Sequence, residues 1–508
     1  MPLSGFETAL GLVFDPYVLL VILLAALFGL FVGALPGLTA TMATALLVPI
    51  TFFMDPVPAI GAIVAAVAMA IFAGDISGTL LRIPGTPASA AYVEDAHRMT
   101  RKGQAELALG LCLVTSAIGG LFGSAVLAFS APSLAEVALQ FSSFEYFWLA
   151  CFGLSCAVFI STDAPVKGVV SLLIGLFIAT IGIDIIAGHP RFSFGNVELM
   201  GGVSFIPAMI GMFAIGEILR FATTTGPKLE VASQAIVHIF RGLGRTLWRY
   251  KVNLFRGNLI GVAIGILPGA GADIAAWISY AVAKRFSKEP EKFGTGHPEG
   301  LVDAGAANNS ALGGAWVPAL VFGIPGDSVT AIVIGVLYMK NVNPGPTVLL
   351  HAPELLYSVF IVFFLANLLM LPLGYAAIRL SRQILRVPRD TLMPIILIFC
   401  IVGAFAINNT VFGVGIILVL GVVAYVMEEN GFPIAPAILG IVLGPLVEEN
   451  FMTSMIKSNG NLIGFFERPI AAGLGVVTLL IWAWVIIAWA VRAARAGGPA
   501  DAGEERAV

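Results

Sequence analysis

The chain has 508 residues, of which 58% are hydrophobic and 11% are charged, and its formal net charge is −3. Soluble proteins carry about 25% charged residues, so this composition excludes a sizeable soluble domain, and no part of it suggests nucleic-acid binding. Several apolar stretches reach the roughly 20 residues that cross a bilayer core: Val18–Leu35, Ala105–Ala128, Leu355–Ile378 and Ile470–Val491. The sequence therefore predicts an all-α polytopic membrane protein with about 10–12 transmembrane segments.

The N-terminal segment is not expected to be a cleavable signal peptide. The segment Met1–Tyr17 contains no Lys or Arg, whereas a signal peptide starts with a basic region. We therefore expect the first helix to stay in the mature protein. The lack of basic residues also places the N-terminus on the periplasmic side by the positive-inside rule.

The first membrane repeat, residues 1–225, contains two Pro-Gly interruptions within apolar sequence. They lie in "GALPGLTATMATALLVP", residues 33–49, and in "RIPGTPASA", residues 82–90. Proline removes a backbone donor and glycine loosens the chain, so each pair breaks a helix. In a membrane, a broken backbone is tolerated only where protein or a water-filled cavity satisfies its polar groups. Broken or re-entrant helices are therefore expected at both places.

A linker, residues 226–256, separates the two repeats. Gly226-Pro227 marks a break, and the segment Ala232–Lys251 has apolar residues at helical spacing with arginines at every fourth position: Arg241, Arg245 and Arg249. This pattern predicts a basic amphipathic helix that lies on the cytoplasmic membrane surface.

The second membrane repeat, residues 257–491, contains the same two interruptions in the same order. They are "GILPGAGADIAAWISYA", residues 265–281, and "GIPGDSVTA", residues 323–331. Two similar motifs in one order indicate an internal duplication. The remaining residues, 492–508, are predicted to form a disordered cytoplasmic tail.

The basic residues indicate that the two repeats have opposite orientations. In the first half, Arg98, Arg101 and Lys102 follow the second motif, whereas in the second half the cluster Lys284–Lys292 follows the first motif. The corresponding loop in the other half is nearly neutral in each case. Because basic loops face the cytoplasm, the halves are predicted to form an inverted repeat, as in many secondary transporters.

Paired helix breaks in inverted repeats predict a transport site near the middle of the membrane. Free N–H groups at a helix start favour anions, and nearby hydroxyl groups add neutral donors, so the site suits a carboxylate. The candidate substrate-binding residues are Pro36, Gly37, Thr39, Thr41, Pro84, Gly85, Thr86, Ser89, Pro268, Gly269, Gly271, Asn308, Asn309, Ser310, Pro325, Gly326, Ser328 and Thr330.

Three aspartates near the motifs are candidates for cation coupling: Asp75, Asp273 and Asp327. A carboxylate inside a membrane is costly and therefore functional by default, so a Na+ or H+ site is expected at one of them. Helix capping is the alternative for Asp273 and Asp327. Arg82 could bind a substrate carboxylate, extend to the membrane surface or pair with Asp75. No cofactor is expected.

These motifs resemble the large permease subunit of the tripartite tricarboxylate transporter (TctA) family. The resemblance covers nearly the whole chain and rests on long stretches: "GALPGLTATMATALLVP", "GDISGTLLRIPGTPASAA", "GIDIIAGHPRFSFG", "GILPGAGADIAAWISY", "GHPEGLVDAGAANNSALGGAWVPALVFGIPGDSVTA" and "NPGP". The family positions match the four Pro-Gly pairs and the polar residues Asp75, Asp184, Asp273, Asn308, Asn309 and Asp327.

The resemblance implies a bacterial inner-membrane importer rather than an enzyme. It further implies two partners, a small membrane subunit (TctB-like) and a periplasmic solute-binding protein (TctC-like) that delivers a di- or tricarboxylate such as citrate. A Na+ or H+ gradient, not ATP, would drive uptake. An uncoupled carboxylate channel of the same architecture is the alternative function. Homo-oligomerisation and the choice between elevator and rocking motion stay open at this stage.

Overall fold

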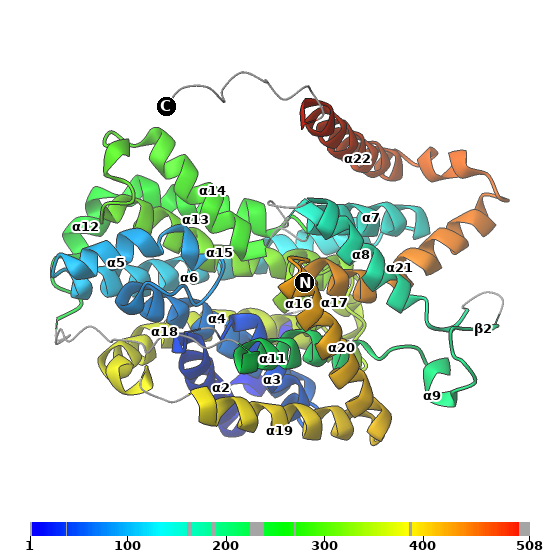
Figure 1. Ribbon diagram of the computed structural model, residues 1–508, viewed down its shortest axis with the longest axis horizontal. Helices are drawn as coiled ribbons and strands as arrows, with labels where there is room; N and C mark the ends of the chain where they lie inside the picture. Colours follow the sequence, from blue (N-terminus) through cyan, green and yellow to red (C-terminus); the bar gives the residue numbers. More distant parts are fainter. Residues whose placement is uncertain are drawn as a thin grey trace, which may run out of the picture.

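The computed structural model describes residues 3–36, 38–159, 165–184, 188–223, 238–268, 271–385 and 389–496. These residues are almost entirely helical (Figure 1), and strand is limited in them to one antiparallel pair in which Gly182 is opposite Arg191. Within this described part of the chain, seven helices are long and apolar enough to cross a membrane, and five shorter apolar helices accompany them. The predicted all-α polytopic membrane fold is confirmed.

The described residues of the first half form eleven α-helices, one 3-10 helix, one π-helix and two short strands. Its elements are α1 (Leu3–Val13), α2 (Pro16–Ala34), α3 (Ala40–Thr51), α4 (Pro56–Leu81), the 3-10 helix η1 (Ser89–Ala91), α5 (Val93–Arg101), α6 (Ala105–Ala138), α7 (Ser143–Phe159), α8 (Pro165–Ala179), β1 (Gly182–Ile183), β2 (Pro190–Arg191), α9 (Val197–Met200), α10 (Phe205–Met209), the π-helix η2 (Ile210–Ile215) and α11 (Gly216–Thr223).

The second half continues in the same manner. Its elements are α12 (Leu243–Arg249), α13 (Lys251–Gly265), α14 (Gly271–Phe286), η3 (Pro290–Lys292), α15 (Pro298–Phe322), α16 (Ser328–Met339), α17 (Val348–His351), α18 (Pro353–Ile384), α19 (Arg389–Asn408), α20 (Val411–Glu429), α21 (Ile434–Lys457), η4 (Leu462–Phe466) and α22 (Pro469–Ala496). The halves interleave: α6 packs along α15, and α18 packs along α4 (Figure 1).

Two predicted boundaries differ from the structure. The amphipathic helix predicted over Ala232–Lys251 is shorter, because residues 238–242 form turns and α12 begins only at Leu243. Residues 224–237 lie outside the described part of the chain. At the C-terminal end, α22 extends to Ala496, so its last turn includes residues 492–496 that the sequence assigned to the tail.

The helical pair α2 and α4 owes its close packing to small residues. A Cβ atom added at Gly29 would lie 2.1 Å from the carbonyl oxygen of Ala66, and one at Gly33 would lie 2.4 Å from that of Ala70. Only glycine allows the two backbones to approach so closely, and small residues at such spacing are typical of helix pairs in membranes.

The pair α13 and α15 repeats this packing at aligned positions. A Cβ atom at Gly261 or at Gly265 would lie 2.4 Å from the carbonyl oxygen of Ala307 or Ala311, respectively. Each of these glycines aligns with one in α2, and each alanine with one in α4. The internal duplication therefore extends from the motifs to the contacts between helices.

The second break has the same geometry in both halves. The residue that ends α4 is Arg82, with φ 61°, and the residue that ends α15 is Gly323, with φ 68°. Both are left-handed, a conformation that is strained for arginine and free for glycine. An Ile-Pro-Gly sequence follows in each case, so the duplicated motif preserves a backbone turn even where the side chain differs.

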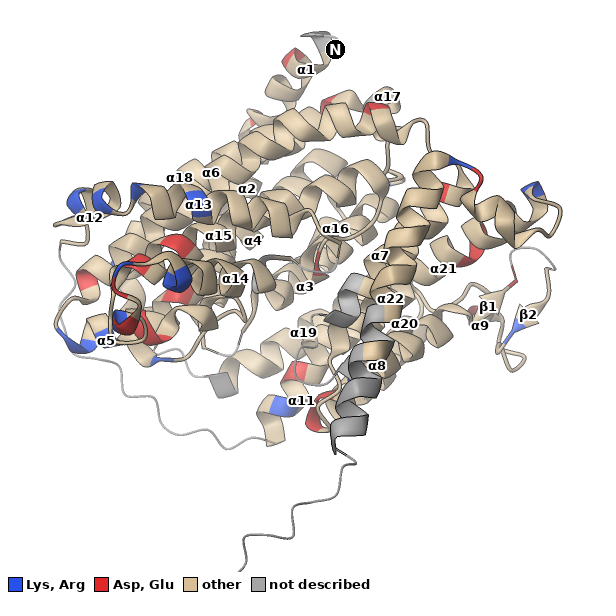
Figure 2. Cartoon of the chain, turned by 90° about the horizontal axis from the view of Figure 1, so that it is seen from above, with Lys and Arg blue, Asp and Glu red and all other residues tan. Residues whose placement is uncertain are grey.

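Two layers of loops lie at opposite ends of α4. After α16, the Nζ of Lys340 donates to the carbonyl oxygen of Phe52, 2.7 Å away, in the loop after α3. We call these two loops the neutral face. After α5, the Nζ of Lys102 donates to the carbonyl oxygen of Thr295, 2.7 Å away, in the loop after α14. We call these loops, with α12, the basic face; Lys and Arg gather there (Figure 2).

Equivalent helices run in opposite directions between these faces. The 26 residues of α4 span about 39 Å from the neutral face to Arg82, which pairs with Glu94 of α5. In contrast, α15 starts beside the basic face and ends near the neutral one, where Leu320 accepts a hydrogen bond from the N–H of Gly345. Because α4 and α15 occupy the same place in the two repeats, the repeats are inverted, as the charge pattern predicted.

A buried carboxylate joins the halves at the basic face. Asp95 of α5 is fully buried. It accepts hydrogen bonds from the hydroxyl of Tyr280 at 2.7 Å and from the N–H groups of Gly294, Gly296 and His297 at 3.0, 2.7 and 3.0 Å. This set of contacts fixes α5 of the first half to the loop that precedes α15 of the second.

Candidate functional site

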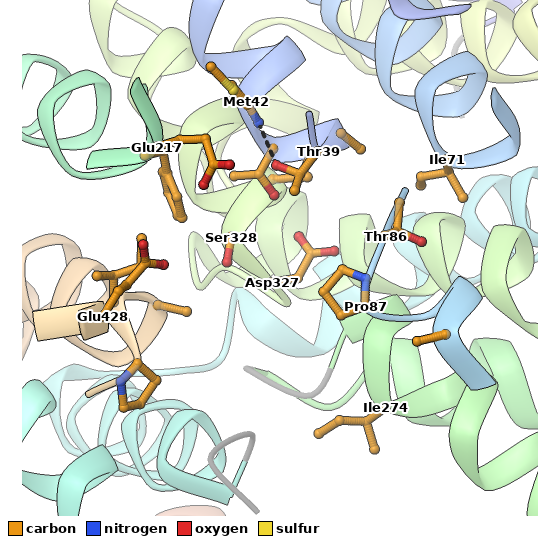
Figure 3. Close-up of a pocket in the computed structure, with 18 of the residues that line it drawn as sticks. Thr39, Met42, Ile71, Thr86, Pro87, Glu217, Ile274, Asp327, Ser328 and Glu428 are labelled. Atoms are coloured by element: carbon orange, nitrogen blue, oxygen red, sulfur yellow. Dashed lines mark hydrogen bonds between the residues drawn. The ribbon is translucent and has the colours of Figure 1, made fainter. Parts of the chain in front are cut away.

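The helix breaks of both halves converge on one cavity of about 900 Å³. This volume is in the range of small-molecule binding sites. The walls come from the starts of α3, α14 and α16, the loop after α4, and parts of α11, α15, α20 and α21 (Figure 3). The lining residues are Thr39, Ala40, Thr41, Met42, Ile71, Thr86, Pro87, Ala90, Phe213, Glu217, Arg220, Ile274, Trp277, Asn308, Asp327, Ser328, Val329, Glu428, Pro433, Ile434 and Ala435.

The start of α3 forms one polar wall of the cavity. Thr39 is the N-cap, and its Oγ1 accepts a hydrogen bond from the N–H of Met42 at 3.2 Å. The N–H groups at the first positions of a helix have no acceptor within the helix. Thr39 and Thr41 line the cavity, so this helix start presents both hydroxyl and backbone donors to it; their contact with substrate stays a prediction.

The start of α16 forms a second polar wall. Asp327 caps the helix reciprocally with Thr330: its Oδ1 accepts the N–H of Thr330 at 2.8 Å, and the hydroxyl of Thr330 accepts the N–H of Asp327 at 2.8 Å. Asp327 is thus a capping residue, yet it also lines the cavity beside Ser328. Thr330 is occupied by the cap and is not among the residues that line the cavity, and its predicted contact with substrate stays a prediction.

A hydrogen-bonded chain runs from the cavity wall to a buried aspartate. Asn308 lines the cavity, and its Nδ2 donates to the hydroxyl of Tyr92 at 3.1 Å. That hydroxyl donates in turn to Oδ1 of Asp75 at 2.7 Å. The second carboxylate oxygen of Asp75 and Oδ1 of Asn308 are buried and without a hydrogen-bond partner in the described part of the chain. Unpaired buried polar atoms are costly, so this chain is a strong candidate for function.

Charged residues that the sequence did not single out line the opposite wall. Glu217 and Arg220 lie on α11, directly after the π-helix η2, and form an ion pair; Glu428 of α20 lies 3.8 Å from Arg220. A π-helix often accompanies a functional site, but it cannot be recognised from composition alone.

Several predicted residues shape the breaks without lining the cavity. Gly85 packs on Gly74 with an N–H to carbonyl distance of 3.3 Å, and Ser89 donates to the carbonyl oxygen of Thr86 at 2.9 Å. Ser310 donates to the carbonyl oxygen of Asn258 at 3.1 Å. The other residues of this kind are Pro36, Pro84, Pro268, Gly271, Asn309, Pro325 and Gly326. They shape the breaks and are not among the residues that line the cavity.

Two glycines and one aspartate of the predicted site fall outside what the structure describes. Gly37 and Gly269 lie outside the described residues, and the side chain of Asp273 is likewise not described. Its neighbours on α14, Ile274 and Trp277, line the cavity, and the indole N–H of Trp277 donates to the carbonyl oxygen of Pro87 at 3.2 Å.

Two further polar residues of the sequence motifs lie elsewhere. Arg82 pairs with Glu94 at 2.7 Å, and its side chain is 62% exposed, so it neither lines the cavity nor pairs with Asp75. Asp184 lies beside β1 and pairs with Arg191 at 3.2 Å.

Comparisons with known proteins agree on one family. The family model described as the Tripartite tricarboxylate transporter TctA family matches residues 19–439. An uncharacterized 52.8 kDa protein in the TAR-I ttuC' 3'region of Agrobacterium vitis is 34% identical over 484 residues, 95% of each chain. An uncharacterized protein in the TAR-II ttuC' 3'region of Agrobacterium vitis is 38% identical over 224 residues, 44% of this chain and 93% of its own. No solved structure matches the chain.

The family match covers most of the chain and includes all four Pro-Gly pairs. The long relative matches almost from end to end. This multi-pass membrane protein therefore belongs to the tripartite tricarboxylate transporter TctA family, whose members are large subunits of three-part transport systems.

Proposed function

We propose that this chain is the large membrane subunit of a secondary transporter that imports a di- or tricarboxylate together with Na+ or H+. The observation that carries the proposal is the meeting of two helix starts, those of α3 and α16, at one cavity between inverted repeats. Helix starts attract carboxylates without a bare cation in the membrane, and such sites at repeat interfaces are typical of secondary transporters.

The charges around the cavity support coupling to a cation. Asp327, Glu217 and Glu428 line it together with Arg220, which is the single Lys or Arg among the described lining residues. A cavity with this excess of acidic groups repels a multivalent anion unless cations or protons enter with it. We propose Asp75, Asp273 and Asp327 as the candidate positions for that cation.

The membrane potential sets a minimum for the coupling. Moving one charge against 100 mV costs about 2.3 kcal/mol, so a trianion that enters a negative cell against that potential costs about 7 kcal/mol. At least three monovalent cations must enter with a trianion to remove this cost, and at least two with a dianion.

The setting we propose is the bacterial inner membrane. The basic face then lies in the cytoplasm by the positive-inside rule, the N-terminus lies in the periplasm and the C-terminus in the cytoplasm. A small membrane subunit and a periplasmic solute-binding protein complete the system, with the binding protein presenting the carboxylate at the neutral face.

Uptake into proteoliposomes tests this function. The chain is reconstituted with its proposed small subunit and binding protein, and radiolabelled citrate and succinate are supplied with a Na+ gradient, a pH gradient or neither. A coupled transporter accumulates substrate above the outside concentration only with a cation gradient. Equilibration without accumulation would instead show an uncoupled channel, and uptake that persists after addition of an uncoupler and removal of Na+ would refute coupling.

A further inference from the structure

Arg220 is placed to contact a ligand in the cavity. Its side chain is 44% exposed, whereas those of Glu217 and Glu428 are 17% and 26% exposed. The guanidinium uses one terminal nitrogen to donate to Glu217, and the contact of its other terminal nitrogen with Glu428, at 3.8 Å, is longer than a hydrogen bond. A guanidinium carries five N–H donors, so donors remain for a further acceptor.

The cavity holds polar groups on more than one wall. Glu217 and Glu428 lie on one side of it, Thr86 and Pro87 lie on the opposite side, and Ser328 lies between them (Figure 3). The walls between these polar groups include the apolar side chains Phe213, Ile71, Ile274, Trp277 and Val329. This arrangement suits a short carbon chain with a carboxylate at each end.

We propose that Arg220 binds the second carboxylate of the substrate while the starts of α3 and α16 hold the first. The inference rests on the proposed function and adds a determinant of specificity. The substrate carboxylate takes the place of Glu428, whose contact is long, and forms paired N–H to oxygen bonds, a geometry to which arginine is suited. Glu217 stays in place and orients the guanidinium. A monocarboxylate has no second carboxylate for Arg220 and is therefore held only by the starts of α3 and α16.

Direct binding to the purified full-length chain in lipid nanodiscs tests this role. Calorimetry is used with three probes: succinate and citrate, which have two and three carboxylates, and butyrate, which has one. Arg220→Gln is expected to weaken succinate and citrate binding by about 10- to 100-fold, the range for a lost charge-assisted pair, and to leave butyrate within twofold. Arg82→Gln, the same change on the basic face, is expected to leave all three unchanged.

A second variant addresses the possibility that Arg220→Gln fails to fold. Glu428→Gln removes the competing carboxylate and keeps the arginine, so it is expected to tighten succinate and citrate binding severalfold without an effect on butyrate. The inference is overturned if folded Arg220→Gln binds succinate like wild type, if it loses butyrate equally, or if Glu428→Gln does not favour the multivalent acids. Wild-type protein that binds none of the probes would refute the proposed function as well.

Discussion

At the scale of single residues, the structure divides the polar residues of the motifs into three roles. Thr39 and Ser328 line the cavity, Thr330 and Ser89 hold the turns, and Asp75 lies behind the wall. The sequence could predict the set, because a polar residue beside a helix break in an apolar run is unusual. It could not divide the set, because whether a hydroxyl faces a cavity or caps its own helix depends on tertiary placement.

The chain of hydrogen bonds through Tyr92 gives the first prediction. Asp75→Asn removes the buried charge, so the cation gradient should no longer drive accumulation and the variant should at most equilibrate the carboxylate across the membrane. Tyr92→Phe deletes the one hydroxyl that links Asp75 to Asn308 and should lower gradient-driven uptake about tenfold, a cost of roughly 1.4 kcal/mol. Uptake in proteoliposomes measures both.

A matched control for this pair is Tyr357→Phe, which removes a tyrosine hydroxyl where α18 packs on α1. It should transport like wild type. If Tyr92→Phe is also indistinguishable from wild type, the buried chain plays no part in coupling.

Asp273 gives a second prediction at this scale. It aligns with Thr41 of the other half, which lines the cavity, and it starts a helix whose later residues do so as well. Asp273→Asn should abolish either transport or its cation dependence, measured by the same uptake assay. Accumulation at the wild-type level would show that this aspartate serves only as a helix cap.

At the scale of helices, the two repeats share backbone contacts that short sequence matches only suggest. The aligned glycines of α2 and α13 meet aligned alanines of α4 and α15. The charge pattern predicted the inversion of the repeats correctly, because the Lys and Arg content of a loop indicates the side of the membrane on which that loop lies. The wall formed by α11 and α20 was missed, because Arg220 and Glu428 are distant in sequence and neither adjoins a Pro-Gly pair.

Close packing of α13 on α15 gives the third prediction. Gly265→Ala places a methyl group 2.4 Å from the carbonyl oxygen of Ala311, so it should destabilise the protein by about 1–3 kcal/mol, as overpacking does. Gly415→Ala in α20 meets nothing within 4 Å and should be neutral or stabilising, because alanine favours a helix. Thermal unfolding, followed by tryptophan fluorescence, compares the two variants. Equal melting temperatures would contradict the close contact of α13 with α15.

At the scale of the whole molecule, inversion and charge together define a topology. Loops that occupy equivalent places in the two repeats lie at opposite faces, and loops from different places in the repeats share a face. The sequence predicted this arrangement from Lys and Arg alone. The mixing of the halves, with α6 on α15 and α18 on α4, had no signal in the sequence, because both surfaces are uniformly apolar.

The topology gives the fourth prediction. In a cysteine-free background, single cysteines at the exposed positions Lys102 and Lys288 should react with a membrane-impermeant thiol reagent only from the cytoplasmic side. Cysteines at the exposed positions Phe53 and Asn343 should react only from the periplasmic side. Labelling of right-side-out and inverted vesicles measures this. If cysteines at positions 102 and 53 both react from the same side of the membrane, the predicted inversion is wrong.

The buried Asp95 restricts how such a transporter can move. Separating α5 from the loop before α15 would strip one carboxylate of four hydrogen bonds at once, each worth about 1.5–3 kcal/mol when the acceptor is charged. A hinge that opens the repeats like a clam at that surface is therefore disfavoured. The helix pairs α2–α4 and α13–α15, with the breaks that follow them, should therefore move together as one rigid unit, and the surface on which they slide should lie at α11 and α20, where Arg220 meets Glu428.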